Sequence, residues 1–259
     1  MRRAVHTHDG PRDAWGIAVE TPVEIGLNGA PFTLMLATPA DLEDLAVGVV
    51  YTERALNDFG AIERIEVFDY FEGMAVNAVV PADRIDAGAL QRRSLEGRTG
   101  CGLCGMESLA ALRRRLDGTA SGAPVPVPVA AISRAFAALP AHQRLNEVTR
   151  SVHAAAWCTP DGEIGCVRED VGRHNALDKV IGALARAGRL GEAGFVVMTS
   201  RCSFELVYKA AAARASLLAT ISAPTSLALE WAGTLGVPLA CCGPGGEITF
   251  FDQGESDGR

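Results

Sequence analysis

The chain has 259 residues, of which 48% are hydrophobic and 21% are charged, and its formal net charge is −7. This composition is typical of a soluble globular protein, and the acidic balance argues against a general nucleic-acid-binding protein because no basic face dominates. No stretch approaches the roughly twenty apolar residues of a membrane span, and an odd count of seven cysteines in a chain of this length favours a reducing cytoplasm.

The N-terminal part of the chain predicts a small α+β domain. We expect residues 1–13 to form a polar, mobile tail and neither a signal peptide nor an anchor. Asn28-Gly29 is a strong hairpin signal, and Thr38 is predicted to cap a helix over residues 39–56. Hydrophobic alternation predicts strands on both sides of these features, at residues 16–25, 31–37, 62–69 and 74–80. The resulting ββαββ order is typical of an α+β domain.

A glycine-rich segment, RTGCGLCG at residues 98–105, places Cys101 and Cys104 three positions apart. It lies between two predicted helices, at residues 86–96 and 106–116. A thiol at a helix start lies near unpaired N–H groups and the positive end of the helix dipole, and both favour the nucleophilic thiolate. Considered alone, this spacing leaves a reactive loop and a structural turn equally open.

Other known cysteine motifs fit this segment less well. A structural zinc site needs a second CxxC or a Cys/His pair, which the chain does not offer. A thioredoxin-like pair follows a strand within a βαβ unit, and a dinucleotide-binding GxGxxG also needs a strand before it. A zinc deaminase needs H-x-E, whereas alanine stands two positions after His153. We therefore expect no metal site and no zinc.

Composition divides the chain into two domains. We expect a small domain over residues 14–118 that carries the CxxC loop at its C-terminal end, a Pro/Val-rich connector over residues 119–132, and a second domain over residues 133–259. The connector could instead be an edge strand of the second domain.

The second domain alternates apolar strands with helices. Strands are predicted at residues 152–157, 163–167, 195–199, 217–221, 238–242 and 248–251. Helices are predicted at residues 175–187, 204–215 and 226–235. This alternation predicts an α/β fold with a mainly parallel sheet and helices on both faces.

Ligands of such sheets bind where the carboxyl ends of strands lead into helices. Three loops at that edge carry arginine, histidine and hydroxyl side chains, the groups that hold phosphate. The candidates are Arg173, His174, Ser200, Arg201, Ser203, Ser222 and Thr225. Any one loop is better explained by helix capping, through Asn175, Ser203 and Thr225 or Ser226. Three such loops on one edge favour a large anionic ligand that carries phosphates.

The remaining cysteines have no predicted catalytic role. We interpret Cys158, Cys166 and Cys202 as buried small residues. Cys241 and Cys242 end a strand, and we expect one of them to face the ligand edge.

Several long segments resemble one known family. They are TPADLEDLAVGVVYTE (38–53), TGCGLCGMESL (99–109), VHAAAW (152–157), REDVGRHNALDKVIG (168–182), SRCSFELVYKAA (200–211) and SAPTSLALE (222–230). In this order they are similar to the formate dehydrogenase accessory sulfurtransferases, the FdhD or FdhD/NarQ family, over residues 15–251.

The resemblance implies a cytoplasmic sulfur carrier for molybdenum enzymes. Such a protein takes sulfur from a cysteine desulfurase as a cysteine persulfide and passes it to bis-molybdopterin guanine dinucleotide, which then enters formate dehydrogenase. It implies that Cys101 carries the persulfide and that Cys104 assists. It also implies a cytidine-deaminase-like larger domain and a cofactor-binding stretch at Cys241, Cys242, Gly243, Pro244, Gly245 and Gly246. GDP and GTP are expected to mimic the cofactor.

Two other functions fit the same residues. A dithiol oxidoreductase would cycle Cys101 and Cys104 through a disulfide, and a cofactor-binding chaperone would use them structurally. No nucleic-acid or membrane partner is expected. The sequence leaves the client enzyme, the desulfurase and the oligomeric state open, with a homodimer as one candidate.

Overall fold

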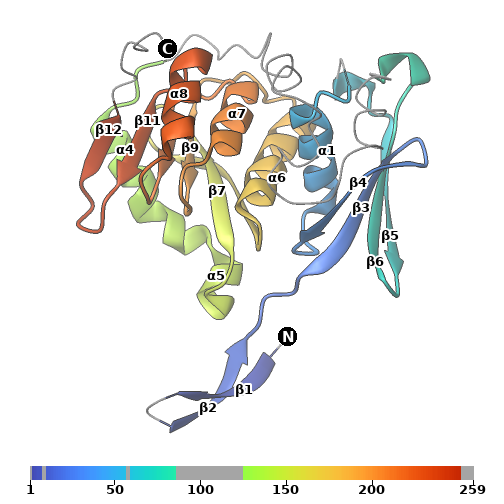
Figure 1. Ribbon diagram of the computed structural model, residues 1–259, viewed down its shortest axis with the longest axis horizontal. Helices are drawn as coiled ribbons and strands as arrows, with labels where there is room; N and C mark the ends of the chain where they lie inside the picture. Colours follow the sequence, from blue (N-terminus) through green and yellow to red (C-terminus); the bar gives the residue numbers. More distant parts are fainter. Residues whose placement is uncertain (1, 8–9, 57–58, 86–124, 252–259) are drawn as a thin grey trace.

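The computed structural model describes residues 2–7, 10–56, 59–85 and 125–251 (Figure 1). The predicted helices at residues 86–96 and 106–116 lie outside these ranges, as do Cys101, Cys104 and the first part of the predicted connector. The described elements form a four-stranded sheet, a six-stranded sheet and a separate two-stranded hairpin.

The four-stranded sheet confirms the predicted ββαββ order. Its strands are β3 (Thr21–Leu27), β4 (Ala30–Ala37), β5 (Arg64–Tyr70) and β6 (Gly73–Val79), in the spatial order β4-β3-β6-β5. Asn28 and Gly29 form the β3–β4 turn with φ of 50° and 79°, as expected for this dipeptide. The helix α1 (Leu42–Thr52) covers one face, because Val23, Ile25 and Val76 point toward it and are fully buried. Short 3-10 turns η1 (Phe59–Ala61) and η2 (Ala82–Arg84) flank β5 and β6.

The predicted start of helix α1 was wrong. The helix begins at Leu42, and its N-cap is Asp41 in the left-handed conformation, without a side-chain cap. Thr38 is instead held by the other half of the chain: its N–H donates to Asp170 Oδ2 (3.0 Å) and its hydroxyl accepts from the N–H of Val171 (3.1 Å). Tertiary partners override the local capping preference here.

The six-stranded sheet is mixed, and the expectation of a mainly parallel sheet was wrong, because only two of its five strand pairings are parallel. Its strands are β7 (His153–Cys158), β8 (Ile164–Asp170), β9 (Phe195–Met198), β10 (Leu218–Thr220), β11 (Leu239–Cys242) and β12 (Ile248–Phe251), in the spatial order β12-β11-β10-β9-β7-β8. Pairing is parallel for β9-β10 and β10-β11 and antiparallel for β7-β8, β7-β9 and β11-β12. Short connections join β7 to β8 and β11 to β12, and such connections permit only antiparallel neighbours.

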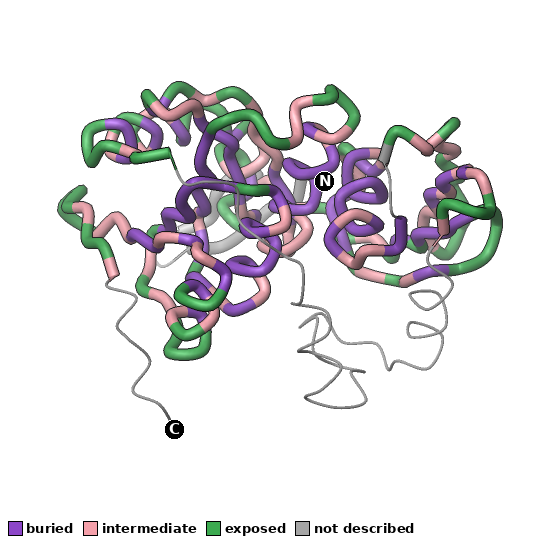
Figure 2. Tube along the Cα trace, turned by 90° about the horizontal axis from the view of Figure 1, so that it is seen from above, coloured by how far each residue is buried: buried purple, intermediate pink, exposed green. Residues whose placement is uncertain are grey.

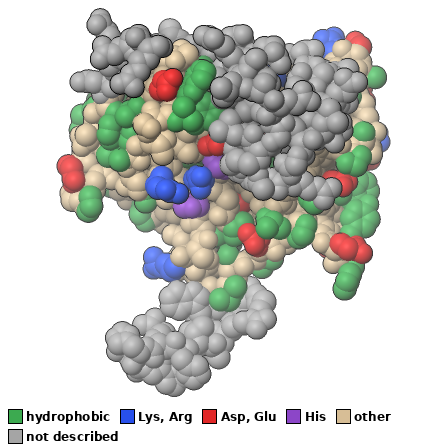
Figure 3. Space-filling model, viewed as in Figure 1, with side chains coloured by type: hydrophobic (Ala, Val, Ile, Leu, Met, Phe, Trp, Pro, Cys, Tyr) green, Lys and Arg blue, Asp and Glu red, His purple; other side chains and the backbone are tan. Residues whose placement is uncertain are grey.

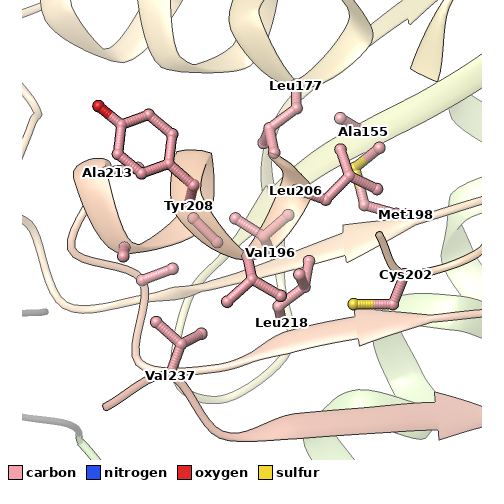
Figure 4. Packing of buried hydrophobic residues seen from close by; sticks show 14 of the residues in the cluster. Ala155, Leu177, Val196, Met198, Cys202, Leu206, Tyr208, Ala213, Leu218 and Val237 are labelled. Atoms are coloured by element: carbon pink, nitrogen blue, oxygen red, sulfur yellow. The ribbon is translucent and has the colours of Figure 1, made fainter. Parts of the chain in front are cut away.

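Helices cover both faces of this sheet, as predicted. On one face lie α6 (Arg173–Arg186), α7 (Phe204–Ala212) and α8 (Ser226–Leu235), which bury Val196, Met198 and Leu218 (Figures 1 and 4). On the other face lies α4 (Val129–Ala138), against Phe195 and Val197. It is followed by η3 (Leu139–His142) and α5 (Arg144–Thr149).

The N-terminal residues do not form the expected tail. β1 (Arg2–Thr7) and β2 (Gly10–Gly16) pair as an antiparallel hairpin that projects from the body (Figure 1). The end of β2 lies against α5, where a Cβ on Gly16 would come within 2.4 Å of the Val148 carbonyl oxygen.

The two sheets meet through α1 and α6, whose backbones touch at glycines. A Cβ on Gly48 would lie 1.8 Å from the carbonyl oxygen of Asp178, and one on Gly182 would lie 1.8 Å from that of Asp44. In Figure 2 the chain is coloured as buried where the two lobes meet. Within the described ranges, no helix is long and apolar enough to cross a membrane.

Candidate functional site

The predicted catalytic pair, Cys101 and Cys104, lies outside the described residues. The candidate site is therefore built from the predicted phosphate-binding loops and from what surrounds them.

These loops share one edge of the six-stranded sheet. In the parallel registers Met198 pairs with Thr220 and Thr220 with Cys241, so the segments after β9, β10 and β11 leave the sheet side by side. β7 is antiparallel to its neighbours, and its first residue, His153, pairs with Asp170 at the end of β8. The segment before α6 therefore joins the same edge, as predicted.

The segment REDVGRHNALDKVIG at residues 168–182, which we call the signature segment, mainly connects structural elements. Arg168 donates to Asp44 of α1 (2.8 Å), and it is not free to bind a ligand. The Glu169 carboxylate accepts from the N–H groups of Leu145 and Asn146 at the start of α5 (both 2.8 Å). Arg168, Glu169 and Asp170 are consecutive at the end of β8, and each forms hydrogen bonds with a different part of the chain.

Asp170 is fully buried at the centre of this junction. Lys179 Nζ donates to its carboxylate (2.6 Å) and to the carbonyl of Thr38 (3.0 Å). Asn175 also donates to Asp170 (2.9 Å), and to the carbonyl of Leu36. Asn175 is therefore no helix cap, since the N-cap of α6 is Gly172. A fully buried ion pair with several hydrogen bonds of this kind fixes position more than it adds stability.

Arg173 and His174 are the signature residues that remain for a ligand. Arg173 Nε is buried and makes no hydrogen bond in the described structure. His174 Nε2 lies 3.4 Å from Ser203 Oγ and 3.7 Å from Glu205 Oε2, so the N-terminal ends of α6 and α7 contact each other. Burial acts to raise the pKa of Glu205, but hydrogen bonds from His174 and Ser203 outweigh it and hold that pKa below its usual value.

His153 lies beside this group, at the start of β7. Its Nδ1 is 3.3 Å from the carbonyl oxygen of Thr199. Burial, together with the charges of Arg173 and His174, holds the pKa of His153 below its usual value. The charge of Arg173 acts on His153, so Arg173, His174 and His153 form one basic cluster, with the Glu205 carboxylate beside it. Arginine and histidine side chains gather near the centre of the face shown in Figure 3.

The hydroxyl groups of the other two loops differ in the hydrogen bonds that they form within the protein. Ser200 is buried and donates to the carbonyl of Arg201 (3.0 Å), and Thr225 caps α8 by accepting from the N–H of Ala228 (3.2 Å). Ser203 is the N-cap of α7 without a side-chain cap bond, and Ser222 is half-buried. Arg201 is exposed, and no described carboxylate forms an ion pair with it.

The predicted cofactor-binding stretch forms the turn between β11 and β12. The N–H of Gly243 donates to the carbonyl of Glu247 (2.8 Å), and Gly246 has a φ of +84°. The Glu247 carboxylate lies over the turn, because a Cβ on Gly243 would be 1.8 Å from one of its oxygens. Burial and this carboxylate raise the pKa of both Cys241 and Cys242, so both stay as thiols at neutral pH. The Glu247 carboxylate disfavours an anion beside Gly243.

Cys158 and Cys202 are buried, as predicted. Burial raises the pKa of each of these two thiols to about 12. The prediction was wrong for Cys166, which is only half-buried, although burial also raises its pKa.

A cleft of about 470 Å³ opens beside the same sheet edge, on the α4 side. Its polar wall consists of Gln143, Asn146, Arg150, Ser151, His153 and Thr199. Sequence reasoning missed this cleft because it assigned no helix to residues 133–151, whose helices are short. His153 and Thr199 belong both to the cleft and to the sheet edge, so the two features are continuous.

Comparison with known proteins shows similarity along nearly the whole chain. The model of the FdhD/NarQ family matches residues 18–256. The chain is 45% identical over 240 residues to the sulfur carrier protein FdhD of Xanthomonas axonopodis pv. citri (strain 306), covering 92% of this chain and 85% of that protein. It is 48% identical over 242 residues to the protein of the same name from Chromobacterium violaceum, covering 91% and 88%.

A solved structure shares the fold. It is the crystal structure from Desulfotalea psychrophila assigned to a formate dehydrogenase accessory protein, with a TM-score of 0.72 and 22% sequence identity. The similarity covers 99% of this chain and 96% of that one.

Proposed function

The chain belongs to the FdhD/NarQ family, and on this premise we propose that it is a sulfur carrier protein that serves formate dehydrogenase. The observation that carries the proposal is the similarity to sulfur carrier proteins over more than nine-tenths of the chain. The TGCGLCG segment supplies the nucleophile that such a carrier needs.

The proposed chemistry begins with a thiolate at Cys101. This thiolate attacks the terminal sulfur of a persulfide on a cysteine desulfurase; the S–S bond of the donor breaks, and the desulfurase leaves as its thiolate. Cys101 then holds the sulfur as a persulfide. Attack by the Cys104 thiolate on Sγ of Cys101 forms a disulfide and releases hydrosulfide for the molybdenum cofactor. The two thiols supply the electrons, and a cellular dithiol reductant restores them.

The second half of the chain is proposed to hold the cofactor substrate, bis-molybdopterin guanine dinucleotide. The basic cluster of Arg173, His174 and His153, together with the exposed Arg201, suits its phosphates, because arginine binds phosphate through two parallel hydrogen bonds. Arg173 Nε has no acceptor in the described protein, which is what an incomplete anion site would show. GDP and GTP are the proposed mimics. A cytidine-deaminase-like fold for this half and a homodimeric state stay predictions.

Mass spectrometry after incubation with a cysteine desulfurase and cysteine tests the proposal. We expect one added sulfur on Cys101, and none in Cys101→Ala. A dithiol oxidoreductase would show only the loss of two hydrogens across Cys101 and Cys104, with no added sulfur at any time, whereas the proposed carrier forms that disulfide only after its persulfide has appeared. A chaperone with structural cysteines would still activate formate dehydrogenase with both cysteines replaced by serine, and that result would contradict the proposal.

A further inference from the structure

The four-stranded sheet has a second face that no helix of the described structure covers. Helix α1 lies against one face, and the opposite face, which we call the outer face, points away from the six-stranded sheet (Figure 1). Side chains alternate between the two faces of a sheet, so the neighbours of the buried Val23, Ile25 and Val76 lie on the outer face. The strand registers place two rows of residues across it: Leu34, Glu24, Ala75 and Phe68 form one row, and Leu36, Pro22, Gly73 and Tyr70 form the other.

Large apolar side chains of these two rows are exposed together. The exposed fractions are 43% for Leu34, 55% for Leu36, 42% for Phe68 and 57% for Tyr70. The rings of Phe68 and Tyr70 stack with their centroids 6.3 Å apart, so they form one continuous aromatic surface. Phe71, at the tip of the β5–β6 hairpin, is fully exposed. A single exposed apolar residue needs no explanation, but a contiguous group of them marks an interaction surface.

The charged groups of the outer face are either acidic or already paired. Arg64 donates to Glu66 (3.0 Å), which also accepts from Asn77 (3.1 Å). Glu24 lies within one of the apolar rows and Glu72 lies at the hairpin tip; both are exposed, and neither forms an ion pair with the described residues. A partner that covers this face must supply a positive charge to Glu24, because a buried carboxylate without a partner is costly.

This combination of apolar surface and negative charge selects among possible occupants. The carboxylates repel an anionic partner, whether a nucleic acid or an anionic lipid surface. In a symmetric dimer the same patch meets itself, so the unpaired carboxylates of both copies would lie in one interface and repel each other. The occupant that fits is a different protein, one that presents basic side chains beside an apolar surface.

The position of the outer face indicates which partner of a sulfur carrier would use it. The chain reaches Ile85 beside Leu56 in the lobe of the four-stranded sheet, and Cys101 follows sixteen positions later, closer along the chain than Val125 in the other lobe. The loops proposed to hold the cofactor lie on the six-stranded sheet. A protein on the outer face therefore leaves these loops open to the client, as a sulfur donor must.

We propose that the outer face of the four-stranded sheet docks the cysteine desulfurase that loads Cys101. A basic side chain of the desulfurase pairs with Glu24, and its apolar surface covers Leu36, Phe68 and Tyr70. The inference rests on the proposed function and deepens it, since it names the surface through which the carrier meets its sulfur donor.

Loading of Cys101 from two different sulfur donors tests the inference. One donor is a purified cysteine desulfurase with cysteine, and the other is glutathione persulfide, a small molecule that needs no docking surface. Mass spectrometry follows the added sulfur over time. In Glu24→Lys and in the double variant Leu36→Ser/Tyr70→Ser, loading from limiting desulfurase should be about tenfold slower or more. Loading from glutathione persulfide should match the wild type, because the replaced side chains are exposed and the fold does not depend on them.

Two variants elsewhere on the surface are matched controls. Glu163→Lys makes the same change in net charge as Glu24→Lys, at an exposed position in the β7–β8 turn. Phe250→Ser removes a similarly exposed ring from β12 of the other sheet. Both should load at the wild-type rate from either donor. Added salt should slow loading of the wild type by the desulfurase more than loading of Glu24→Lys, because salt screens the attraction between charged surfaces.

The outcomes separate this inference from the proposed function. Wild-type loading by the desulfurase in both outer-face variants would overturn the docking surface and leave the sulfur-carrier function intact. No added sulfur on Cys101 from either donor would overturn the sulfur-carrier function, and the docking surface with it. Normal loading in the variants together with weaker binding of formate dehydrogenase, or with loss of a dimer in analytical ultracentrifugation, would assign the face to the client or to a second copy and would also overturn the inference.

Discussion

Arg201 and Arg173 offer a ligand two different kinds of charge. Arg201 is exposed, whereas Arg173 has a buried Nε without a partner. A buried donor costs free energy until it is satisfied, so Arg173 gains most when an anion arrives. An exposed guanidinium is free to reorient, and Arg201 is better suited to capture the anion.

Replacing Arg201 by alanine should lower the affinity for GDP about ten- to a hundredfold, the effect of losing a hydrogen bond to a charged group. Arg201→Lys should restore only part of the affinity if the contact is bidentate. Calorimetry measures both. Arg214→Ala is the control, since Arg214 is exposed just beyond the other end of α7. Equal affinity in wild type and Arg201→Ala would place the phosphates elsewhere.

The affinity for GDP should also depend on pH through His153. Burial, with Arg173 and His174, depresses its pKa, so it is mostly neutral at pH 7. A bound phosphate favours the charged imidazolium, so binding and protonation favour each other, and affinity should rise as pH falls from about 8 to 6. His153→Gln should weaken this pH dependence, and titrations at several pH values would show it. The same slope in the variant would exclude His153.

At the scale of elements, turn residues and periodicity predicted most strands and helices. Asn28-Gly29 marked a hairpin correctly, and α8 has the predicted bounds. What could not be predicted depends on partners distant in sequence. Thr38 matches a local capping pattern, yet its hydrogen bonds go to residues more than a hundred positions away.

The sequence predicted one part of the candidate site, the loop edge of the sheet, but not the cleft beside it. The loops after β8, β9 and β10 share one edge of the sheet, as predicted. This edge could be predicted because an apolar strand followed by a helix shows where the carboxyl end of the strand lies. The cleft could not be predicted, since α5 is one short helix whose N-terminus is held by Glu169 from another element. The role of Cys101 and Cys104 stays a prediction.

The crossing of α1 and α6 depends on its glycines. Gly182→Ala should destabilise the fold by about 3 kcal/mol or more, because the new Cβ would lie 1.8 Å from the Asp44 carbonyl oxygen and both backbones would have to separate. The higher helix propensity of alanine offsets only about 1 kcal/mol. Chemical denaturation measures the difference. Gly165→Ala is the control, since the nearest neighbour of its Cβ would be the flexible Arg189 side chain at 3.4 Å. Wild-type stability in Gly182→Ala would show that the helices can separate freely.

At the scale of the whole molecule, buried charges join the two sheets. Lys209 of α7 donates to both oxygens of Asp178 on α6 (2.7 and 2.8 Å) and to the hydroxyl of Thr52 on α1 (2.9 Å). Tyr208 of α7 donates a hydrogen bond to the carbonyl of Thr52 on α1, and Tyr51 of α1 donates one to the carbonyl of Ala212 on α7. Helix α1 thus belongs to the packing of both halves, and the two predicted domains should behave as one unit.

This arrangement predicts that the protein unfolds in a single thermal transition, and that a mutation at the junction changes the melting temperature of the whole protein. Lys209→Met leaves the buried Asp178 without its cation, and the loss should be about 3–5 kcal/mol. For a chain of this size that corresponds to a decrease in Tm of roughly 10 °C. Arg64→Met breaks the exposed pair with Glu66 and should cost less than about 1 kcal/mol. Differential scanning calorimetry of the three proteins would show one peak in each, shifted only in Lys209→Met. Two peaks, of which one stays at the wild-type temperature, would mean that the halves unfold independently and that the α1–α6 junction does not couple them.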